Sequence, residues 1–405
     1  MKAAVLKFGG SSFLRTDDYA RVAGHIADRL QAGENKIIAV VSAMSGTTDN
    51  LKEVVLDVNK HASGSNLDAA LATGEMLSAC LLEAAISRLG IPVTSLNGYG
   101  LGIRTNSEFG RAAVSSADPQ PLLSTLPHHD VVVVTGAQAI DQSGRLTMLG
   151  RNSSDLTAVV VAQMLGERAC EIYSNVPGVY SADPYLIPGA RLIPEIAYSM
   201  IAQMSRYGAK VLHWRAVEFA KQHALTIICK ALASHGVVTG TIVKGNGSAR
   251  AVTIANDVAL VVFTSPEERD TFRTVLDQND VSTICIEGDG GSELCILSEV
   301  EFAMRVGALA RARWASVRFE TAVTELDCSE MRVHFEVDYE RAVSLARQIH
   351  ERMYPGTADE PLRENLRHRL GSSSQLVGAA AVRSERGFRD SCPLTRREAR
   401  VGLSG

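Results

Sequence analysis

The sequence predicts an α/β protein whose larger part is a mostly parallel sheet covered by helices on both faces. Short apolar strands alternate with amphipathic helical segments: a strand at residues 3–6 precedes a helix over 19–30. The order recurs with a strand at 36–41 and a helix over 51–59, and a third apolar run covers 131–135. Strands that alternate with helices in this way build parallel sheets that are buried on both faces.

Composition fits a globular chain of two or three domains. The 405 residues are 46% hydrophobic and 21% charged, which excludes disordered, collagen-like and disulfide-scaffold proteins. The 41 basic and 45 acidic residues give a net charge of −4. No global positive field would therefore attract nucleic acid or an anionic membrane. Small molecules or other protein chains are the expected partners.

Cysteine usage and the apolar runs predict a soluble, cytoplasmic protein. The seven cysteines show no CxxC pair and no metal-ligand spacing, as expected for reduced thiols packed as small apolar residues. The first ten residues lack the pattern of a signal peptide. The most apolar runs, such as 131–134 and 158–161, are too short to cross a bilayer.

The middle of the chain continues the alternation. Residues 153–155, Ser-Ser-Asp, precede an Ala/Val-rich segment and predict the beginning of a helix, whose free amides suit an anion. Residues 174–191 contain three prolines and two glycines, which predicts a long structured loop. Helical periodicity covers 198–223, and 226–230 reads as a closing strand.

A linker at 244–250 separates this part from two smaller α/β units within 251–356. The first unit is predicted from strands at 258–263, 282–287 and 293–298, a helix over 267–278 and a helix beginning near Glu299. A weaker second copy is predicted from strands at 317–324 and 331–337 and a helix over 339–353. Residues 357–405 contain nine arginines, no lysine and one aromatic residue, so we expect this tail to be disordered.

A phosphate site is predicted at the end of the first strand. The sequence has no GxxxxGK[ST], no GxGxxG after a strand and no protein-kinase HRD or DFG motif. Lys7 followed by Gly9 and Gly10 offers a cation and backbone amides, the groups that phosphoryl transfer requires. The alternative is that the glycines form only a tight turn and that Lys7 is a solvated strand end.

Seven motifs in order along the chain resemble the aspartate kinases, which have the amino acid kinase fold. They are residues 7–12 (KFGGSS), 41–49 (VSAMSGTTD), 72–75 (ATGE), 101–105 (LGIRT), 149–158 (LGRNSSDLTA), 176–184 (VPGVYSADP) and 208–213 (GAKVLH). The resemblance spans residues 2–243 and implies a catalytic domain over 1–243. It also implies paired ferredoxin-like ACT regulatory units over 251–356, through which a homodimer or a higher homo-oligomer would associate.

The resemblance assigns roles to individual residues. The implied catalytic residues are Lys7 and Asp155. The implied amino-acid-binding residues are Ser42, Thr48, Glu75, Arg151 and Ser154. The implied nucleotide-binding residues are Lys7, Gly9, Gly10, Ser11, Ser174, Asn175, Tyr180, Asp183 and Lys210.

ATP and Mg²⁺ are the implied cofactors, with no dedicated metal ligands from the protein. The implied reaction is phosphorylation of the side-chain carboxylate of aspartate, or of a close analogue, to an acyl phosphate. This would be the first step of aspartate-family amino acid biosynthesis or of a specialised pathway.

Each of four assignments has a structural alternative. Glu75 could be a first-turn acid favoured by a helix dipole, Arg151 a surface arginine, and Asp155 only a helix cap. Lys210 could mark a helix end. All four alternatives would have to coincide with the order of the motifs.

Several positions depart from the family pattern. Asn152 and Ser153 stand where the family has two glycines, and Ala137 stands where it has an aromatic residue. Asn175 replaces an aspartate of the nucleotide loop. Residues 262–269 also lack the glycine of a ligand-binding ACT turn, which argues against an amino acid effector. A kinase for a different amino acid, or a catalytically silent homologue, therefore remains an alternative.

Overall fold

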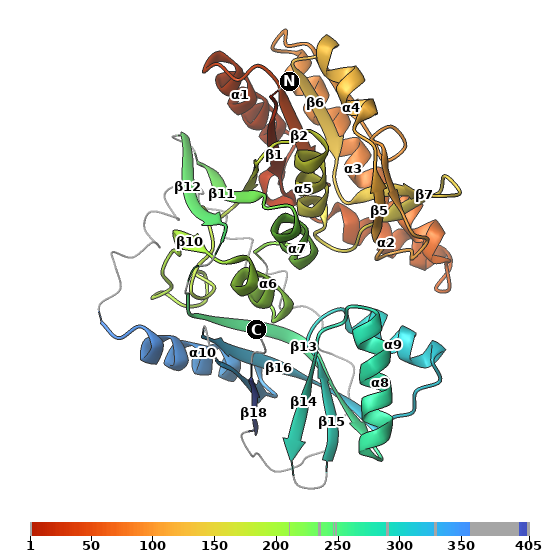
Figure 1. Cartoon of the computed structure of the whole chain (residues 1–405), viewed down its shortest axis with the longest axis vertical. Helices are drawn as coiled ribbons and strands as arrows, with labels where there is room; N and C mark the ends of the chain where they lie inside the picture. Colours follow the sequence, from red (N-terminus) through yellow and green to blue (C-terminus); the bar gives the residue numbers. More distant parts are fainter. Residues whose placement is uncertain are drawn as a thin grey trace.

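The computed structural model describes residues 2–209, 211–233, 236–245, 247, 249–288, 291–327, 330–356 and 397–402. Figure 1 shows a larger α/β part that contains the N-terminus and, below it, a second sheet with its own helices. The two parts meet along helix α6 (Tyr198–Arg206) and strand β13 (Ala251–Phe263).

An eight-stranded sheet forms the centre of the larger part. Its order is β10-β12-β11-β9-β1-β2-β6-β3, and only the β11–β12 pair is antiparallel. The strands are β1 (Ala4–Phe8), β2 (Ile37–Val41), β3 (Val93–Leu96), β6 (Val131–Thr135), β9 (Ala169–Ser174), β10 (Glu195–Ile196), β11 (Thr226–Ala233) and β12 (Gly236–Val243). The predicted parallel sheet is confirmed.

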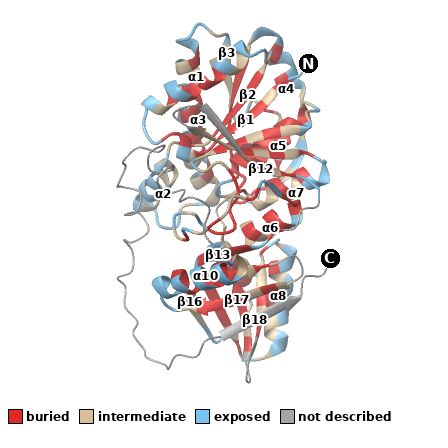
Figure 2. Cartoon of the chain, turned by 90° about the vertical axis from the view of Figure 1, so that its left-hand side faces the viewer, coloured by how far each residue is buried: buried red, intermediate tan, exposed pale blue. Residues whose placement is uncertain are grey.

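Helices cover both faces because alternate strand residues point to opposite sides. Leu6 and Ile37 pack in one buried cluster with α1 (Asp17–Gln31) and α3 (Gly64–Ser87). Val5 and Ile38 belong to another cluster with α5 (Ser154–Met164). Figure 2 shows the buried strands between these layers. The shorter helices of this part are α2 (Thr47–Val58), α4 (Gln120–Thr125), the 3₁₀ turn η2 (Leu126–His128) and α7 (Trp214–Gln222).

Helix α3 begins at Gly64, well before Glu75. It has 24 residues and is long and apolar enough, by length and composition alone, to cross a membrane. In the structure it packs against α1 and β6 and buries two acids, Asp68 and Glu75. Glu75 therefore lies in the middle of the helix, and the alternative that it is a first-turn acid is wrong.

A four-stranded sheet, which we did not predict, lies beside the carboxyl ends of β2 and β6. Its order is β5 (Val114–Ala117), β4 (Ile103–Thr105), β7 (Gln138–Asp141) and β8 (Leu146–Met148). Asp68 of α3 connects this sheet to the helix. The Oδ2 atom of Asp68 accepts hydrogen bonds of 2.8 Å from the amides of Gly110 and Met148. Burial raises the pKa of Asp68 to about 6.

The single helix expected over 198–223 is divided into α6 and α7. The chain leaves the helix at Tyr207 and Gly208, and Gly208 has φ +104°. A Cβ there would lie 2.7 Å from the Cβ of Ala255 in β13, so only glycine fits this conformation and this close approach. The break lets the chain pass against the second sheet.

The second sheet has the order β14-β15-β13-β16-β17-β18 and is antiparallel throughout. Its elements after β13 are α8 (Pro266–Gln278), β14 (Thr283–Gly288), β15 (Gly291–Ile296), α9 (Val300–Leu309), β16 (Ser316–Leu326), β17 (Glu330–Glu336), α10 (Tyr339–Met353) and β18 (Arg397–Gly402). Helices α8 and α9 pack together on β13, while α10 packs on β13, β16 and β17.

The second α/β unit contains the elements that we expected: β16 and β17 match the predicted strands at 317–324 and 331–337, and α10 matches the predicted helix over 339–353. β13 pairs with β16 from Ala251 to Val262, so both strands serve the two units within one sheet. Within the described residues, the second unit then adds β17, α10 and β18. The sequence pattern could not show that the long strand β13 is shared.

Most of the tail that we expected to be disordered, 357–396 and 403–405, lies outside the described residues. Arg397–Gly402 differ from that expectation, because they form β18 against β17. Backbone hydrogen bonds to the open edge of β17 can order a segment that has few apolar residues of its own.

A buried arginine joins the two parts. Arg111, 4% exposed, donates from Nε to Glu299 Oε1 at 2.7 Å and from Nη2 to the carbonyl of Asp280 at 3.0 Å. Its guanidinium also lies 4.6 Å from the ring centre of Phe302. Since a buried guanidinium needs its partners, this contact fixes α9 and the end of α8 against the larger part.

Candidate active site

Lys7 lies at the carboxyl end of the central strand β1 and is almost fully buried. Its Nζ is 2.7 Å from Oδ1 of Asp155, in the first turn of α5. The second carboxylate oxygen of Asp155 accepts a hydrogen bond of 3.0 Å from the amide of His213. The carboxylate is thus compensated by a cation on one side and by an amide on the other, as a buried charge requires.

The glycine turn after β1 leaves room beside the ammonium group. A Cβ on Gly9 would lie 3.2 Å from Lys7 Nζ, and one on Gly10 would lie 3.1 Å from the carbonyl oxygen of Ala43. The chain then forms a 3₁₀ turn, η1 (Gly10–Ser12), in which Ser11 is exposed. In the part of the chain that the structure describes, the amides of Gly10 and Ser11 donate to no other group. Free amides beside a cation can bind phosphate oxygens.

Two serines meet at the end of the neighbouring strand β2. Ser42 donates from Oγ to Oγ of Ser154 at 2.9 Å, so the chain after β2 touches the beginning of α5. Gly136 makes this approach feasible, because a Cβ there would lie 2.5 Å from the side chain of Ser154. These contacts bring Ser42 and Ser154 to the same edge of the sheet as Lys7 and Asp155.

Glu75 supplies a buried carboxyl group to this edge. It is 4% exposed, and its Oε1 accepts a hydrogen bond of 3.4 Å from the amide of Ala43, next to Ser42. Its Oε2 is buried and has no hydrogen-bond partner among the described residues. Burial raises the pKa of Glu75 to about 7. A buried carboxyl oxygen without a partner can receive an ammonium group.

Arg151 does not join the buried group. Its side chain is 83% exposed and pairs with Oδ1 of Asp49 at 3.0 Å. Asp49 follows Thr48 in the first turn of α2. Gly150 and Asn152 on either side of Arg151 have positive φ, +112° and +58°. Asn152 therefore adopts the backbone conformation for which the family pattern supplies glycine, and asparagine tolerates it better than most residues.

The loop 174–191 begins where β9 ends, next to β1. Ser174 Oγ donates to the carbonyl of Val176 at 2.7 Å, and Asn175 Nδ2 donates to the hydroxyl of Tyr185 at 3.2 Å. Asp183 accepts the amide hydrogen of Tyr185 at 2.8 Å. Tyr180, expected at the nucleotide, is 4% exposed and lies in a hydrophobic cluster with α10. Lys210, also expected there, lies outside the described residues.

Sequence reasoning missed two residues of this site, His213 and Asp49. His213 is the residue before α7, and its main-chain amide binds Asp155. Burial lowers the pKa of the imidazole to about 4. Both residues fall within the motifs of the resemblance, but a main-chain donor and a surface ion pair have no signal in the sequence.

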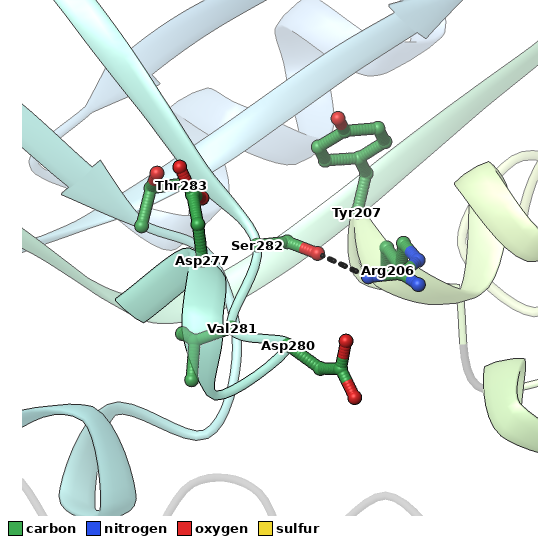
Figure 3. Close-up of a pocket in the computed structure, with 7 residues that line it drawn as sticks. All are labelled: Arg206, Tyr207, Asp277, Asp280, Val281, Ser282 and Thr283. Carbon is green, nitrogen blue, oxygen red and sulfur yellow. Dashed lines mark hydrogen bonds between the residues drawn. The ribbon is translucent and has the colours of Figure 1, made fainter. Parts of the chain in front are cut away.

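A cavity lies away from this group, at the seam of the two parts. It encloses about 290 Å³ between the end of α6 and the beginning of β14. Figure 3 shows its lining, in which Arg206 donates to Ser282 Oγ at 3.0 Å. Lys7 and Asp155 do not line it, so this cavity is separate from the candidate active site.

The model of the amino acid kinase family matches residues 2–230, more than half of the chain. The chain belongs to the amino acid kinase family. This family, predicted from the order of the motifs, is therefore confirmed. The match ends in β11 and includes Lys7, Ser42, Glu75 and Asp155.

Among similar members of the family are two aspartokinases. The one from Geobacillus stearothermophilus is 37% identical over 227 residues, and the one from Mycolicibacterium smegmatis is 36% identical over 247 residues. These alignments cover 56% and 61% of this chain, and 56% and 58% of the relatives. The chain thus spans just over half the length of the curated relatives it matches.

Solved structures of this family extend the similarity to the second part. E. coli aspartokinase III in complex with aspartate and ADP matches with a TM-score of 0.67, covering 87% of this chain and 100% of that chain. The sequence identity is 20%, so this match shows the fold alone. It confirms the predicted amino acid kinase fold followed by ACT-like α/β units.

Proposed function

We propose that this protein is an ATP-dependent kinase that phosphorylates the side-chain carboxylate of aspartate. The buried Lys7–Asp155 pair at the glycine turn of β1 carries the proposal. Similarity to aspartokinases at 36–37% identity supports the acceptor, and one structural relative was solved with aspartate and ADP.

The chemistry follows from these groups. An oxygen of the acceptor carboxylate attacks the γ-phosphorus of ATP, the bond to the bridging oxygen breaks, and ADP leaves. No proton has to move, because the acceptor is already ionised. Lys7 stabilises the negative charge on the transferred group, and Asp155 fixes the position of Lys7. The free amides of Gly10 and Ser11 bind phosphate oxygens.

Magnesium enters this proposal as part of the nucleotide substrate. ATP needs a divalent ion to neutralise its phosphates during transfer. No group of three or more His, Cys, Asp or Glu side chains suitable for a metal occurs among the described residues. An ion held mainly by phosphate oxygens and water would fit this set of residues.

The acceptor site is proposed around Ser42 and Ser154. Glu75 would receive the α-ammonium group on its Oε2. This buried oxygen has no hydrogen-bond partner among the described residues. Arg151 would bind a carboxylate with its planar fork, exchanging the carboxylate of Asp49 for that of the substrate. Thr48, next to Asp49, would line the same side.

We further propose that the protein is cytoplasmic and forms a homo-oligomer through the ACT-like sheet. The cysteines of the described part are free thiols, as in a reducing compartment. β14 lies at the end of the strand order of the second sheet, and the part of its edge that β18 does not contact would supply hydrogen-bonding groups for association.

Hydroxylamine trapping tests the proposed function. The protein is incubated with ATP, magnesium, hydroxylamine and one member of a panel of amino acids. An acyl phosphate gives a hydroxamate, whereas a phosphate ester does not. The proposal predicts a hydroxamate with aspartate; ADP formation without hydroxamate would favour a hydroxyl acceptor, and no turnover with any amino acid would favour a silent homologue.

A further inference from the structure

The apolar side of the loop 174–191 packs against the ACT-like part. Its apolar residues share one buried cluster with α10 and with the sheet beneath it. The loop contributes Tyr180, Ala182, Ile187 and Ala190; α10 contributes Ala342, Leu345, Ala346 and Ile349; the sheet contributes Val252 and Val323. A loop of the catalytic domain thus has its hydrophobic side covered by the regulatory helix.

Ser181 is the polar centre of this contact and is fully buried. Its amide donates to the carbonyl of Arg191 at 2.9 Å, and its carbonyl accepts from the amide of Val252 at 2.8 Å. Its Oγ accepts from the amide of Arg191 at 2.8 Å and lies 2.8 Å from Nε2 of His350 on α10.

The Ser181 hydroxyl has one hydrogen and two acceptor lone pairs, and the Arg191 amide uses one of the lone pairs. Its hydrogen can therefore be donated to Nε2 of His350 in one tautomer of the imidazole. An accepting Nε2 belongs to a neutral imidazole with its hydrogen on Nδ1. Burial, and next the nearby Arg191, lower the pKa of His350, which agrees with the neutral form.

The two sides of the loop are held by different parts of the protein. On the catalytic side, the amide of Val179 donates to Thr241 Oγ1 at 2.7 Å. There a Cβ on Gly178 would lie 2.3 Å from the same oxygen. On the regulatory side, Arg347 Nε donates to the carbonyl of Leu186 at 3.0 Å, in addition to the His350 contact. The conformation of the loop therefore depends on α10.

We propose that His350 is a positioning residue for the nucleotide: through Ser181 it holds the loop 174–191 in the conformation that binds ATP. The regulatory helix α10 thereby sets the affinity of the catalytic domain for nucleotide. This inference rests on the proposed function and on the nucleotide-binding role that the family resemblance implies for Ser174, Asn175, Tyr180 and Asp183, which all lie in this loop. His350 itself need not touch the nucleotide.

The test uses the full chain with two replacements of His350. His350→Leu removes the acceptor but keeps apolar bulk, whereas His350→Gln keeps an acceptor near the position of Nε2. The affinity for ADP with magnesium is measured by calorimetry, and kcat and both KM values by hydroxamate formation. Arg352→Gln is the matched control, because Arg352 lies on the same helix and pairs with Glu325 of the ACT-like sheet.

We expect His350→Leu to weaken ADP binding and to raise the KM for ATP about fivefold, the scale of one hydrogen bond. The KM for aspartate and kcat should stay within about twofold, His350→Gln should recover most of the affinity, and Arg352→Gln should match the wild type. Unchanged ADP affinity in His350→Leu would overturn the inference. So would a loss spread equally over kcat and both KM values, since that indicates general unfolding.

Failure of the proposed function looks different. A wild-type protein that binds ADP but forms no hydroxamate would refute phosphorylation of a carboxylate, and ADP affinity of the His350 variants would still decide the positioning role. A wild-type protein that binds no ADP would refute both.

Discussion

Replacing Glu75 by glutamine should stabilise the fold above neutral pH while weakening acceptor binding. Burial raises the pKa of Glu75 from 4.5 to about 7. The folded chain therefore keeps this proton to a higher pH than the unfolded chain. Stability is lost as the pH rises from about 4.5 to about 7, because the unfolded state ionises first. A pKa difference of about 2.5, at about 1.4 kcal/mol per pKa unit, costs about 3 kcal/mol at pH 8.

Glutamine cannot ionise, so the Glu75→Gln variant does not lose this free energy of unfolding at high pH. Its Oε1 can still accept from the amide of Ala43. We expect a melting temperature at least about 5 °C above the wild type at pH 8 and little difference near pH 5. The KM for aspartate should rise about tenfold or more, since a charged hydrogen bond to the ammonium group is lost.

Thermal unfolding at pH 5 and pH 8, with hydroxamate kinetics at pH 8, measures both effects. Glu83→Gln on the same helix serves as the control, because Glu83 is only half-buried. A Glu75→Gln protein no more stable than the wild type at pH 8, or equally stabilised at both pH values, would refute the reasoning from burial. A stabilised variant with unchanged KM would place the ammonium group elsewhere.

Lys7→Met should lower kcat by roughly 100-fold or more and also lower the melting temperature, because the buried Asp155 loses its cation. Adding Asp155→Asn should recover the melting temperature but not the activity; recovery of activity would contradict the role of Lys7. Arg151→Lys should raise the KM for aspartate tenfold or more and leave ADP affinity measured by calorimetry unchanged, since an ammonium lacks the planar fork. Collapse of ADP affinity instead would put Arg151 in the nucleotide site. Gly178→Ala should destabilise the protein, whereas Gly24→Ala in open space within α1 should stabilise it by about 0.5–1 kcal/mol; equal melting temperatures would argue against the tight contact at Gly178.

The parallel sheet and its helices could be predicted because strands such as β1, β2 and β6 and helices such as α1 carry their own periodicity. The separation of α6 from α7 could not be predicted. Glycine is needed at position 208 because Ala255 of β13, which is distant in sequence, lies too close for a side chain. For the same reason the sharing of β13 by two units was missed. Its length depends on pairing with β16, which no local pattern encodes.

Within the site, the resemblance named both Lys7 and Asp155, and the fold brings these residues together in an ion pair although they are far apart in sequence. Residue spacing alone predicted only that Lys7 is a cation at the end of a strand, followed by a glycine turn. The alternative that Arg151 is a surface arginine agrees with its exposed side chain, but its ion pair with Asp49 has no signal in the sequence. The contact of Ser181 with His350 joins two domains and has no local sequence pattern.

The path of one oxygen atom tests the central claim most directly. Aspartate labelled with ¹⁸O in its side-chain carboxylate is incubated with the protein, ATP, magnesium and hydroxylamine. If the carboxylate attacks the γ-phosphorus at the Lys7–Asp155 site, hydroxylamine then attacks the acyl carbon, and the released phosphate carries one ¹⁸O atom per hydroxamate formed. Phosphate without ¹⁸O would contradict the account, because ATP would then have been hydrolysed by water without passing through an acyl phosphate.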